Sequence, residues 1–209
     1  MKILQILLFL CISVLPFGAP QTAIAATLLT FDDLSPGSSS GVIPNGYGGL
    51  QWQGFGVVAG TQFPTTAYYT GMVSPSNVAF NFDQYNRRAY ISSSAPFNLD
   101  SAYLTSGIYA PMRIEVQGFV GDHLTFDNTY PVQASVPTLI NCNYSGVNSI
   151  EFLPQVAGST DVSDAYIFVM DNVSITTVPE PSVWALFAVG AALAGSGLLL
   201  KKPKGMREN

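Results

Sequence analysis

The sequence predicts an all-β protein, a single β-sandwich of the jelly-roll type with a targeting segment at each end. Three observations predict this. Short apolar or alternating stretches recur between turn-forming residues over residues 26–177. No stretch of that body carries a helical period. Uncharged apolar runs stand near both ends of the chain, and they are typical of targeting and membrane segments.

The first segment, residues 1–25, has the three parts of a secretory signal peptide. Lys2 supplies the positive charge, Ile3 to Val14 form an apolar core, and Ala23-Ile24-Ala25 is a small-residue cleavage site. We expect cleavage after Ala25 or Ala26, which would export the rest of the chain.

The body, residues 26–177, is expected to contain eight to ten short strands. Thr27–Phe31 is an apolar, β-branched start, and Met112–Phe119 alternates with a period of two. The other expected strands are Leu50–Phe55, Val78–Phe82, Ala89–Ser92, Phe97–Thr105, His123–Asp127, Val147–Leu153 and Ala165–Thr176. Turn signals between them are Pro36-Gly37, Pro44-Asn45-Gly46, Gly121-Asp122 and Asp127-Asn128.

Two segments are expected to be long loops. Ser35–Gly49 contains five glycines and two prolines, and Gly60–Ser76 carries several aromatic residues. Two readings of these aromatics stay open. In one, they fold back over the edge of the sandwich. In the other, aromatic residues of these loops or of the strand after the first loop form a platform that stacks on the apolar face of a sugar ring. These carbohydrate-binding candidates are Tyr47, Trp52, Tyr68 and Tyr69.

The charge of the body excludes several partners. Residues 26–178 hold three arginines, no lysine and eleven acidic residues, a net charge of 3 − 11 = −8. A chain this acidic, with no basic patch, is a poor partner for nucleic acid or an anionic membrane surface. Arg87-Arg88 has two readings: a clamp for an acidic sugar, or a salt bridge to an acid such as Asp83.

The sequence contains no motif of a known catalytic site. It has no G-x-S-x-G, P-loop, HExxH or CxxC pattern. His123 is the sole histidine, and Cys142 is the only cysteine of the body, so no internal disulfide can form there. Such a cysteine in a strand is usually a small buried residue. We therefore expect a protein that is not an enzyme.

A calcium site is predicted where the first and last strands meet. Asp32 and Asp33 end the first expected strand, and Asp171-Asn172 lies in the last. These strands are commonly neighbours in a jelly roll, and hard oxygen ligands suit Ca²⁺. Adjacent residues of a strand point to opposite faces, so only one of Asp32 and Asp33 is expected to enter the site. The alternative is that these acids cap turns or face solvent.

The C-terminal segment, residues 178–209, joins three features in a fixed order. Pro179-Glu180-Pro181 is a stiff, extended motif. Val183–Leu200 has eighteen uncharged residues, about 27 Å as a helix and enough to cross a bilayer core. A basic cluster follows from Lys201 to Arg207, and positive charge stays in the cytoplasm.

This order, over residues 178–207, resembles the PEP-CTERM sorting signal of Gram-negative bacteria. The resemblance implies a transmembrane sorting helix that an exosortase, a membrane cysteine transpeptidase, cuts near the motif. It also implies a host that makes exopolysaccharide. The alternative is a plain single-pass membrane anchor.

The body is similar to exported jelly-roll domains found in many PEP-CTERM proteins. The similarity spans about residues 28–176, in the stretches LLTFDDL, IPNGYGGLQW, FNLDSAYLTS, RIEVQGFVGD, YSGVNSIEFL and FVMDNVSI. Such domains look like carbohydrate-binding modules, and most have no established activity. Several carbohydrate-binding jelly rolls hold a structural Ca²⁺, so the resemblance also favours the calcium site.

We therefore expect an exported protein of the cell surface or extracellular matrix, anchored briefly in the inner membrane. Its β-sandwich is expected to bind an exopolysaccharide without cleaving it. Two alternatives stay open. One is a structural or adhesive surface protein with no small ligand. The other is a polysaccharide hydrolase, because eleven acidic residues allow a carboxylate pair.

Overall fold

Strands dominate the computed structural model, which describes residues 26–82, 88–107, 112–156 and 166–177. The described strands are β1 (Ala26–Leu29), β2 (Ser40–Val42), β3 (Gln51–Gln53), β4 (Phe55–Ala59), β5 (Asn77–Asn81), β6 (Ala89–Ser106), β7 (Met112–Val120), β8 (His123–Val132), β9 (Thr138–Val156) and β10 (Phe168–Thr177). One short helix, α2 (Ala67–Thr70), and two 3₁₀ turns, Tyr47–Gly49 and Gly60–Gln62, complete the described elements.

Both targeting segments lie outside the described residues. The signal peptide, the Pro179-Glu180-Pro181 motif and the apolar run that follows it therefore stay predictions. None of the helices in the described ranges is long and apolar enough to cross a bilayer. The body forms a compact unit of its own, Ile24–Val178.

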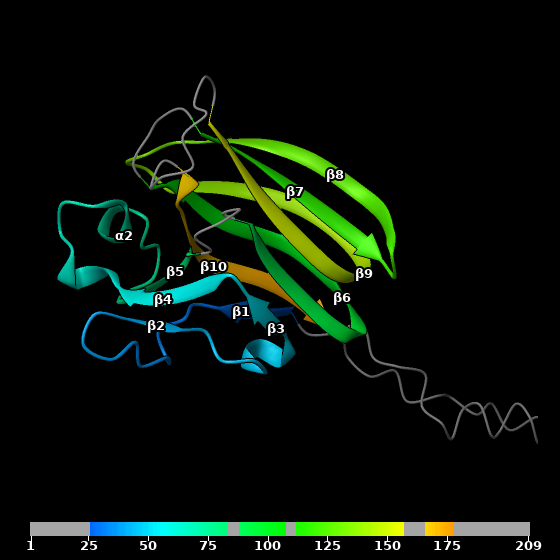
Figure 1. Ribbon diagram of the computed structural model, residues 1–209, viewed down its shortest axis with the longest axis horizontal. Helices are drawn as coiled ribbons and strands as arrows, with labels where there is room; N and C mark the ends of the chain where they lie inside the picture. Colours follow the sequence, from blue (N-terminus) through cyan, green and yellow to red (C-terminus); the bar gives the residue numbers. More distant parts are fainter. Residues whose placement is uncertain (1–25, 83–87, 108–111, 157–165, 178–209) are drawn as a thin grey trace, which may run out of the picture. The chain divides into compact units, whose positions relative to one another are not determined.

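The strands form one continuous antiparallel sheet, because two long strands belong to both layers of the sandwich. The first half of β6 pairs with β3, and its second half pairs with β10. β9 follows β6 along both halves, and the register shifts between Ser92 and Ser101, where β6 bends. One layer is β3–β6–β9–β7–β8, and the other is β2–β4–β5–β10–β6–β9, with β1 beside β10. Figure 1 shows β8 and β4 on opposite sides of the sandwich.

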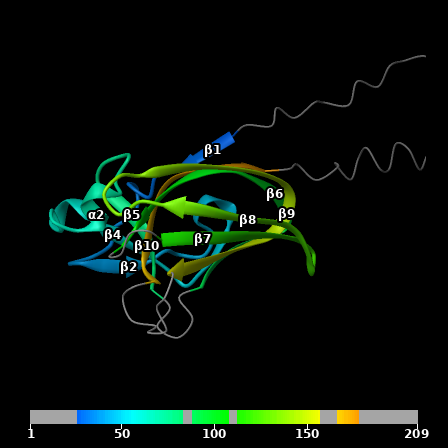
Figure 2. The same ribbon diagram turned by 90° about the horizontal axis from the view of Figure 1, so that it is seen from above.

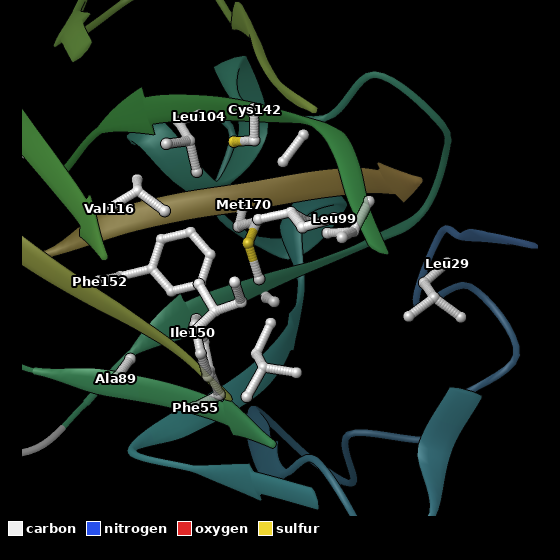
Figure 3. Close-up of a cluster of buried hydrophobic side chains, with 14 of the residues drawn as sticks. Leu29, Phe55, Ala89, Leu99, Leu104, Val116, Cys142, Ile150, Phe152 and Met170 are labelled. Carbon is white, nitrogen blue, oxygen red and sulfur yellow. The ribbon is translucent and has the colours of Figure 1, made fainter. Parts of the chain in front are cut away.

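Aromatic rings join the two layers in the core. Phe55 of β4 meets Phe152 of β9 and Phe168 of β10, with ring centroids 5.8 and 6.0 Å apart. Leucine, valine, isoleucine and methionine side chains fill the space around them, as Figure 3 shows for Leu104, Ile150 and Met170. These side chains are buried, so the hydrophobic effect holds the two layers together without a disulfide.

The structure confirms the β-sandwich and the pairing of the first and last strands, in which Leu29 lies opposite Val173. Four local predictions were wrong. The segment 35–49, expected as a loop, contains β2. The stretches 89–92 and 97–105 are one strand, β6, because bulges carry the ladder through the bend. Asp127-Asn128 is no turn, because both residues pair with Gln117 and Val116 across the β7–β8 ladder. The segment 60–76, expected as a loop, contains α2.

Candidate functional site

A pocket of about 590 Å³ opens beside α2. Figures 1 and 2 both place this helix at one end of the sandwich, next to β4 and β5. The pocket walls come from α2, from the β8–β9 loop and from the backbone next to β6 and β10. Its polar lining is made of hydroxyl groups, and its largest side chain is a tyrosine. The lining residues are Thr65, Thr66, Ala67, Tyr68, Thr70, Gly107, Ala134, Ser135 and Ile167.

Two contacts hold α2 against the sheet. Gly71, the residue that ends the helix, allows a close approach to the sheet because it has no side chain. A Cβ at this position would lie 2.8 Å from Val169 Cγ1. The next residues, Val73 and Ser74, donate their backbone N–H groups to Asp171 Oδ2 at 2.6 and 2.9 Å. The close approach of Gly71 and the buried Asp171 carboxylate therefore fix the pocket wall to β10.

Tyr68 and Tyr69 of this short helix have different surroundings. Tyr68 is half-buried, lines the pocket and makes edge contacts with Phe63 and Phe80, at centroid distances of 5.8 and 5.4 Å. Tyr69 is 46 % exposed and is not part of the pocket lining. The reading in which the loop aromatics fold back over the sandwich therefore holds for Tyr68 and not for Tyr69. Tyr68 folds back over the sheet and still faces the pocket.

Tyr47 and Trp52 lie elsewhere: Tyr47 begins the 3₁₀ turn that precedes β3, and Trp52 lies in β3 itself. Trp52 is 5 % exposed, and its indole nitrogen donates to the carbonyl of Tyr47 at 2.9 Å. Phe31 and Phe55 make edge contacts with the Trp52 ring, with centroids 5.7 and 5.4 Å away. The faces of this indole are therefore taken up by the core, and Trp52 offers no platform for a sugar in this structure.

The Tyr47 hydroxyl ties its loop to the turn after β1. It accepts the N–H of Phe31 at 3.0 Å and donates to Asp33 Oδ1 at 2.9 Å. Burial, followed by the hydrogen bond to the Asp33 carboxylate, raises the pKa of this phenol. These contacts give Tyr47 a structural role in the loop 44–52.

Three of the four residues predicted to hold calcium use carboxylate oxygens as hydrogen-bond acceptors. Asp33 points to Tyr47, while Asp32 Oδ1 accepts the N–H of Asn77 at 2.9 Å. Asp171 is fully buried, and its two oxygens accept the N–H groups of three residues and the Ser74 hydroxyl. The third of these N–H donors belongs to Asn172.

This donor set does not fit calcium. Hydrogen-bond donors fill the positions around both Asp171 oxygens, while Asn172 Oδ1 is the one buried oxygen nearby with no hydrogen-bond partner. Ca²⁺ takes about six to eight oxygen ligands. Among the described residues, no three side chains of His, Cys, Asp or Glu cluster around one point. Calcium binding stays a prediction, and the donor set weighs against it at this position.

Burial raises the pKa of Asp171 to about 6, although the three backbone N–H groups act in the opposite direction. The charge of Asp32 adds to the rise. Folding thus removes this carboxyl group from water. Backbone N–H groups, including those of the segment after α2, then replace water as its hydrogen-bond donors. The group anchors that segment, a role that the sequence pattern did not reveal.

Three other side chains, Cys142, His123 and Arg88, were also considered for catalysis or ligand binding. Burial raises the pKa of the Cys142 thiol to about 11, which suppresses the reactive thiolate. His123 is exposed at the start of β8. Arg88 forms a 2.7 Å salt bridge with Glu151, which also accepts the Tyr90 hydroxyl. The salt-bridge reading is therefore confirmed for Arg88, with Glu151 as its partner, while Asp83 and Arg87 lie outside the described residues.

No protein-family model and no curated protein matches the chain. The fold is similar to several solved β-rich domains at low identity. One is the K1 cleaved adhesin domain of Lys-gingipain from Porphyromonas gingivalis, at 11 % identity and TM-score 0.47, covering 74 % of this chain and 99 % of that one. Another is a DUF4465 family protein from Bacteroides ovatus, at 10 % identity and TM-score 0.42, covering 73 % and 94 %.

A carbohydrate-binding module, CBM51 from Clostridium perfringens GH95 in complex with methyl-galactose, also matches. Its identity is 9 % and its TM-score 0.33, and the match covers 71 % of this chain and 99 % of the module. All three TM-scores are below 0.5, so these similarities assign no family, ligand or activity to the protein. The class that the structure itself defines is a β-sandwich with a hydroxyl-lined pocket at one end.

Proposed function

We propose that the protein binds polysaccharide through the pocket beside α2, without cleaving it. The observation that carries this proposal is the composition of the pocket wall, which combines Tyr68 with the hydroxyl-bearing residues Thr65, Thr66, Thr70 and Ser135. The Thr66 and Thr70 hydroxyls donate to backbone carbonyls and keep their capacity to accept. A tyrosine ring stacks on the apolar face of a pyranose. Threonine and serine hydroxyls donate and accept hydrogen bonds, as sugar hydroxyls do.

The size and charge of the pocket support a neutral, polar ligand. Its volume of about 590 Å³ lies in the ordinary range for small-molecule sites. Among the described residues, none of those that line the pocket is acidic or basic. Sugar units can enter such a pocket without leaving a buried charge unpaired.

We further propose that the chain is exported and sorted to the cell surface or extracellular matrix by an exosortase. The support is the order of motif, apolar run and basic cluster in residues 178–207, together with the signal-peptide pattern in residues 1–25. In this proposal the tail delivers the protein, and the β-sandwich binds exopolysaccharide at its destination.

A glycan array probed with residues 26–178 tests the binding. We expect at least one polysaccharide to bind, and the double variant Thr65→Val/Ser135→Ala to bind at least tenfold more weakly. A tenfold loss corresponds to about 1.4 kcal/mol, in the range of one or two lost hydrogen bonds. The matched control is Leu124→Ala, which trims a side chain that is 48 % exposed on β8, outside the pocket lining.

Each other outcome favours a different function. A silent array would contradict the proposal and favour a structural or adhesive surface protein without a small ligand. Release of reducing sugar by the purified domain, abolished by one carboxylate substitution, would favour a hydrolase.

A further inference from the structure

The outer face of the β2–β4–β5 layer carries apolar side chains next to the pocket. Val42, Gly56 and Phe80 lie directly opposite one another on β2, β4 and β5, so their side-chain positions share one face. Val57 and Ala79, one residue away, are buried in the core, which shows that Val42 and Phe80 point outward. Val42 is 67 % exposed.

Gly56 gives the Phe80 ring its place on this face. A Cβ on Gly56 would lie 2.8 Å from Cε1 and Cζ of Phe80, closer than carbon atoms can approach. The ring therefore lies over the Gly56 backbone, in space that any other residue would fill. The absence of a side chain at position 56 lets an aromatic ring cover the surface of the sheet.

Four rings follow one another along this face and reach the pocket, and three of them are half-buried against the apolar cluster of Val58, Ala67, Val78 and Val169. Phe63 contacts Tyr68, Tyr68 contacts Phe80, and Phe80 contacts Phe82, with centroids 5.8, 5.4 and 6.3 Å apart. Phe82 is 38 % exposed. We call these four residues the aromatic strip. Because Tyr68 belongs both to the strip and to the pocket wall, the two surfaces are continuous.

The charge of the body limits what can lie on the strip. With three arginines against eleven acids, its net charge is 3 − 11 = −8, which repels polyanions. One of those arginines, Arg88, is occupied by Glu151. Uncharged sugar rings meet no such repulsion, and their apolar faces match aromatic carbon.

We propose that the aromatic strip binds successive units of a single, uncharged polysaccharide chain that continues from the pocket beside α2. This inference rests on the proposed function and adds a ligand class and an extended site to it. Neighbouring rings in the strip are inclined to each other by 64°, 71° and 56°. Rings inclined in this way suit a separate chain, whose units can turn relative to one another. A flat crystalline surface would need coplanar rings.

Affinity electrophoresis of residues 26–178 tests the strip. The probes are gels containing soluble neutral chains (mixed-linkage β-glucan, xylan and galactomannan) or an anionic chain (alginate). Insoluble microcrystalline cellulose is tested by sedimentation. We expect retardation by at least one neutral chain, and at least fivefold weaker binding by Phe82→Ala. The exposed control Leu124→Ala should bind as the wild type does.

A second variant covers the case in which Phe82→Ala fails to fold. Gly56→Ala keeps all four rings but displaces Phe80, and it too should weaken chain binding at least fivefold. Thermal melting of both variants verifies folding before binding is compared. A hexasaccharide of the bound chain should bind at least tenfold more tightly than the monosaccharide, because the strip contacts several units.

The outcomes separate the strip from the pocket. If Thr65→Val/Ser135→Ala loses binding while folded Phe82→Ala and Gly56→Ala keep it, the strip is overturned and the pocket stands. Binding to alginate alone, or to microcrystalline cellulose alone, would overturn the ligand class. A dimer that Phe82→Ala converts to a monomer would show that a second copy covers the strip, which also overturns the proposal. No retention by any glycan would overturn both proposals.

Discussion

Asp171 is a carboxyl group that folding removes completely from water. Its hydrogen bonds reach Val73 and Ser74, which lie 98 and 97 residues away in the chain. The sequence showed only an acid in the last strand, and hard-ligand chemistry then suggested calcium. Its main partners are backbone N–H groups, and a pattern of residue types does not predict such partners. The interpretation of this one side chain therefore changes from a metal ligand to an anchor of the α2 segment.

The raised pKa of Asp171 predicts a pH dependence of stability. A pKa of about 6 in the folded state lies above the ordinary value of 3.8, so the folded state binds more protons between these values. The stability that this group contributes is full below about pH 4 and is lost as the pH rises through 6. The change is up to about 3 kcal/mol in the free energy of unfolding.

Urea denaturation of residues 26–178 at pH 4 to 7.5 measures this change. Asp171→Asn should remove most of the decline, because its amide does not titrate. Asp100→Asn is the matched control, because the hydrogen bonds that Asp100 accepts among the described residues come from the side-chain hydroxyls of Ser174 and Thr176. An equal decline in wild type and Asp171→Asn would contradict the prediction. The same curves with EGTA test calcium, for which the donor set predicts no change.

The helix α2 has four residues and owes its place to the contacts around it. An isolated helix of this length is not stable in water. It is held by Gly71 against Val169, by the Asp171 hydrogen bonds and by a small apolar cluster that includes Ala67 and Val78. No periodic pattern of that length can be recognised in a sequence, which explains why the segment 60–76 was predicted to be a loop.

Gly71→Ala is predicted to displace this helix. The new Cβ would lie 2.7 Å from the carbonyl oxygen of Ala67 and 2.8 Å from Val169 Cγ1, so the backbone must shift. We expect a loss of about 1–3 kcal/mol in the free energy of unfolding. Glycan binding at the pocket should weaken as well, because Tyr68 moves with the helix. Urea denaturation and affinity electrophoresis measure the two effects.

Gly41→Ala is the matched control for this substitution. The nearest atoms to its Cβ, in Pro36, are 3.4 Å away, which is ordinary contact. Its stability should change by about 0.5 kcal/mol or less. Equal effects of the two substitutions would show that the close packing at Gly71 is not what holds α2.

Over the whole body, the two layers are joined by the strands β6 and β9, which belong to both. The sequence indicated strands on either side of residues 93–96 but could not show that one ladder continues through the bend. The bulges there depend on pairing with β9, a segment about 50 residues further along the chain.

The sorting proposal concerns the complete chain and predicts a shortened mature protein. Mass spectrometry of the surface-localised protein from cells that contain an exosortase should find a mass without Lys201–Asn209. Replacing Pro179 and Pro181 by alanine should leave the tail attached, because the stiff motif is lost. Ser182→Ala, next to the motif, is the matched control and should be processed normally. A tail retained on most of the surface protein would contradict the proposal.

The sequence by itself determined the β class, most strand positions and the acidic character of the body, because alternation and charge are properties of neighbouring residues. It also supplied the prediction for the two terminal segments. Only the tertiary structure decided which aromatic rings enter the core and which remain at the surface. Trp52 became a buried ring, and Tyr68 joined Phe80 and Phe82 beside the pocket. The physical reason is that burial and hydrogen-bond partners depend on strands brought together from distant parts of the chain.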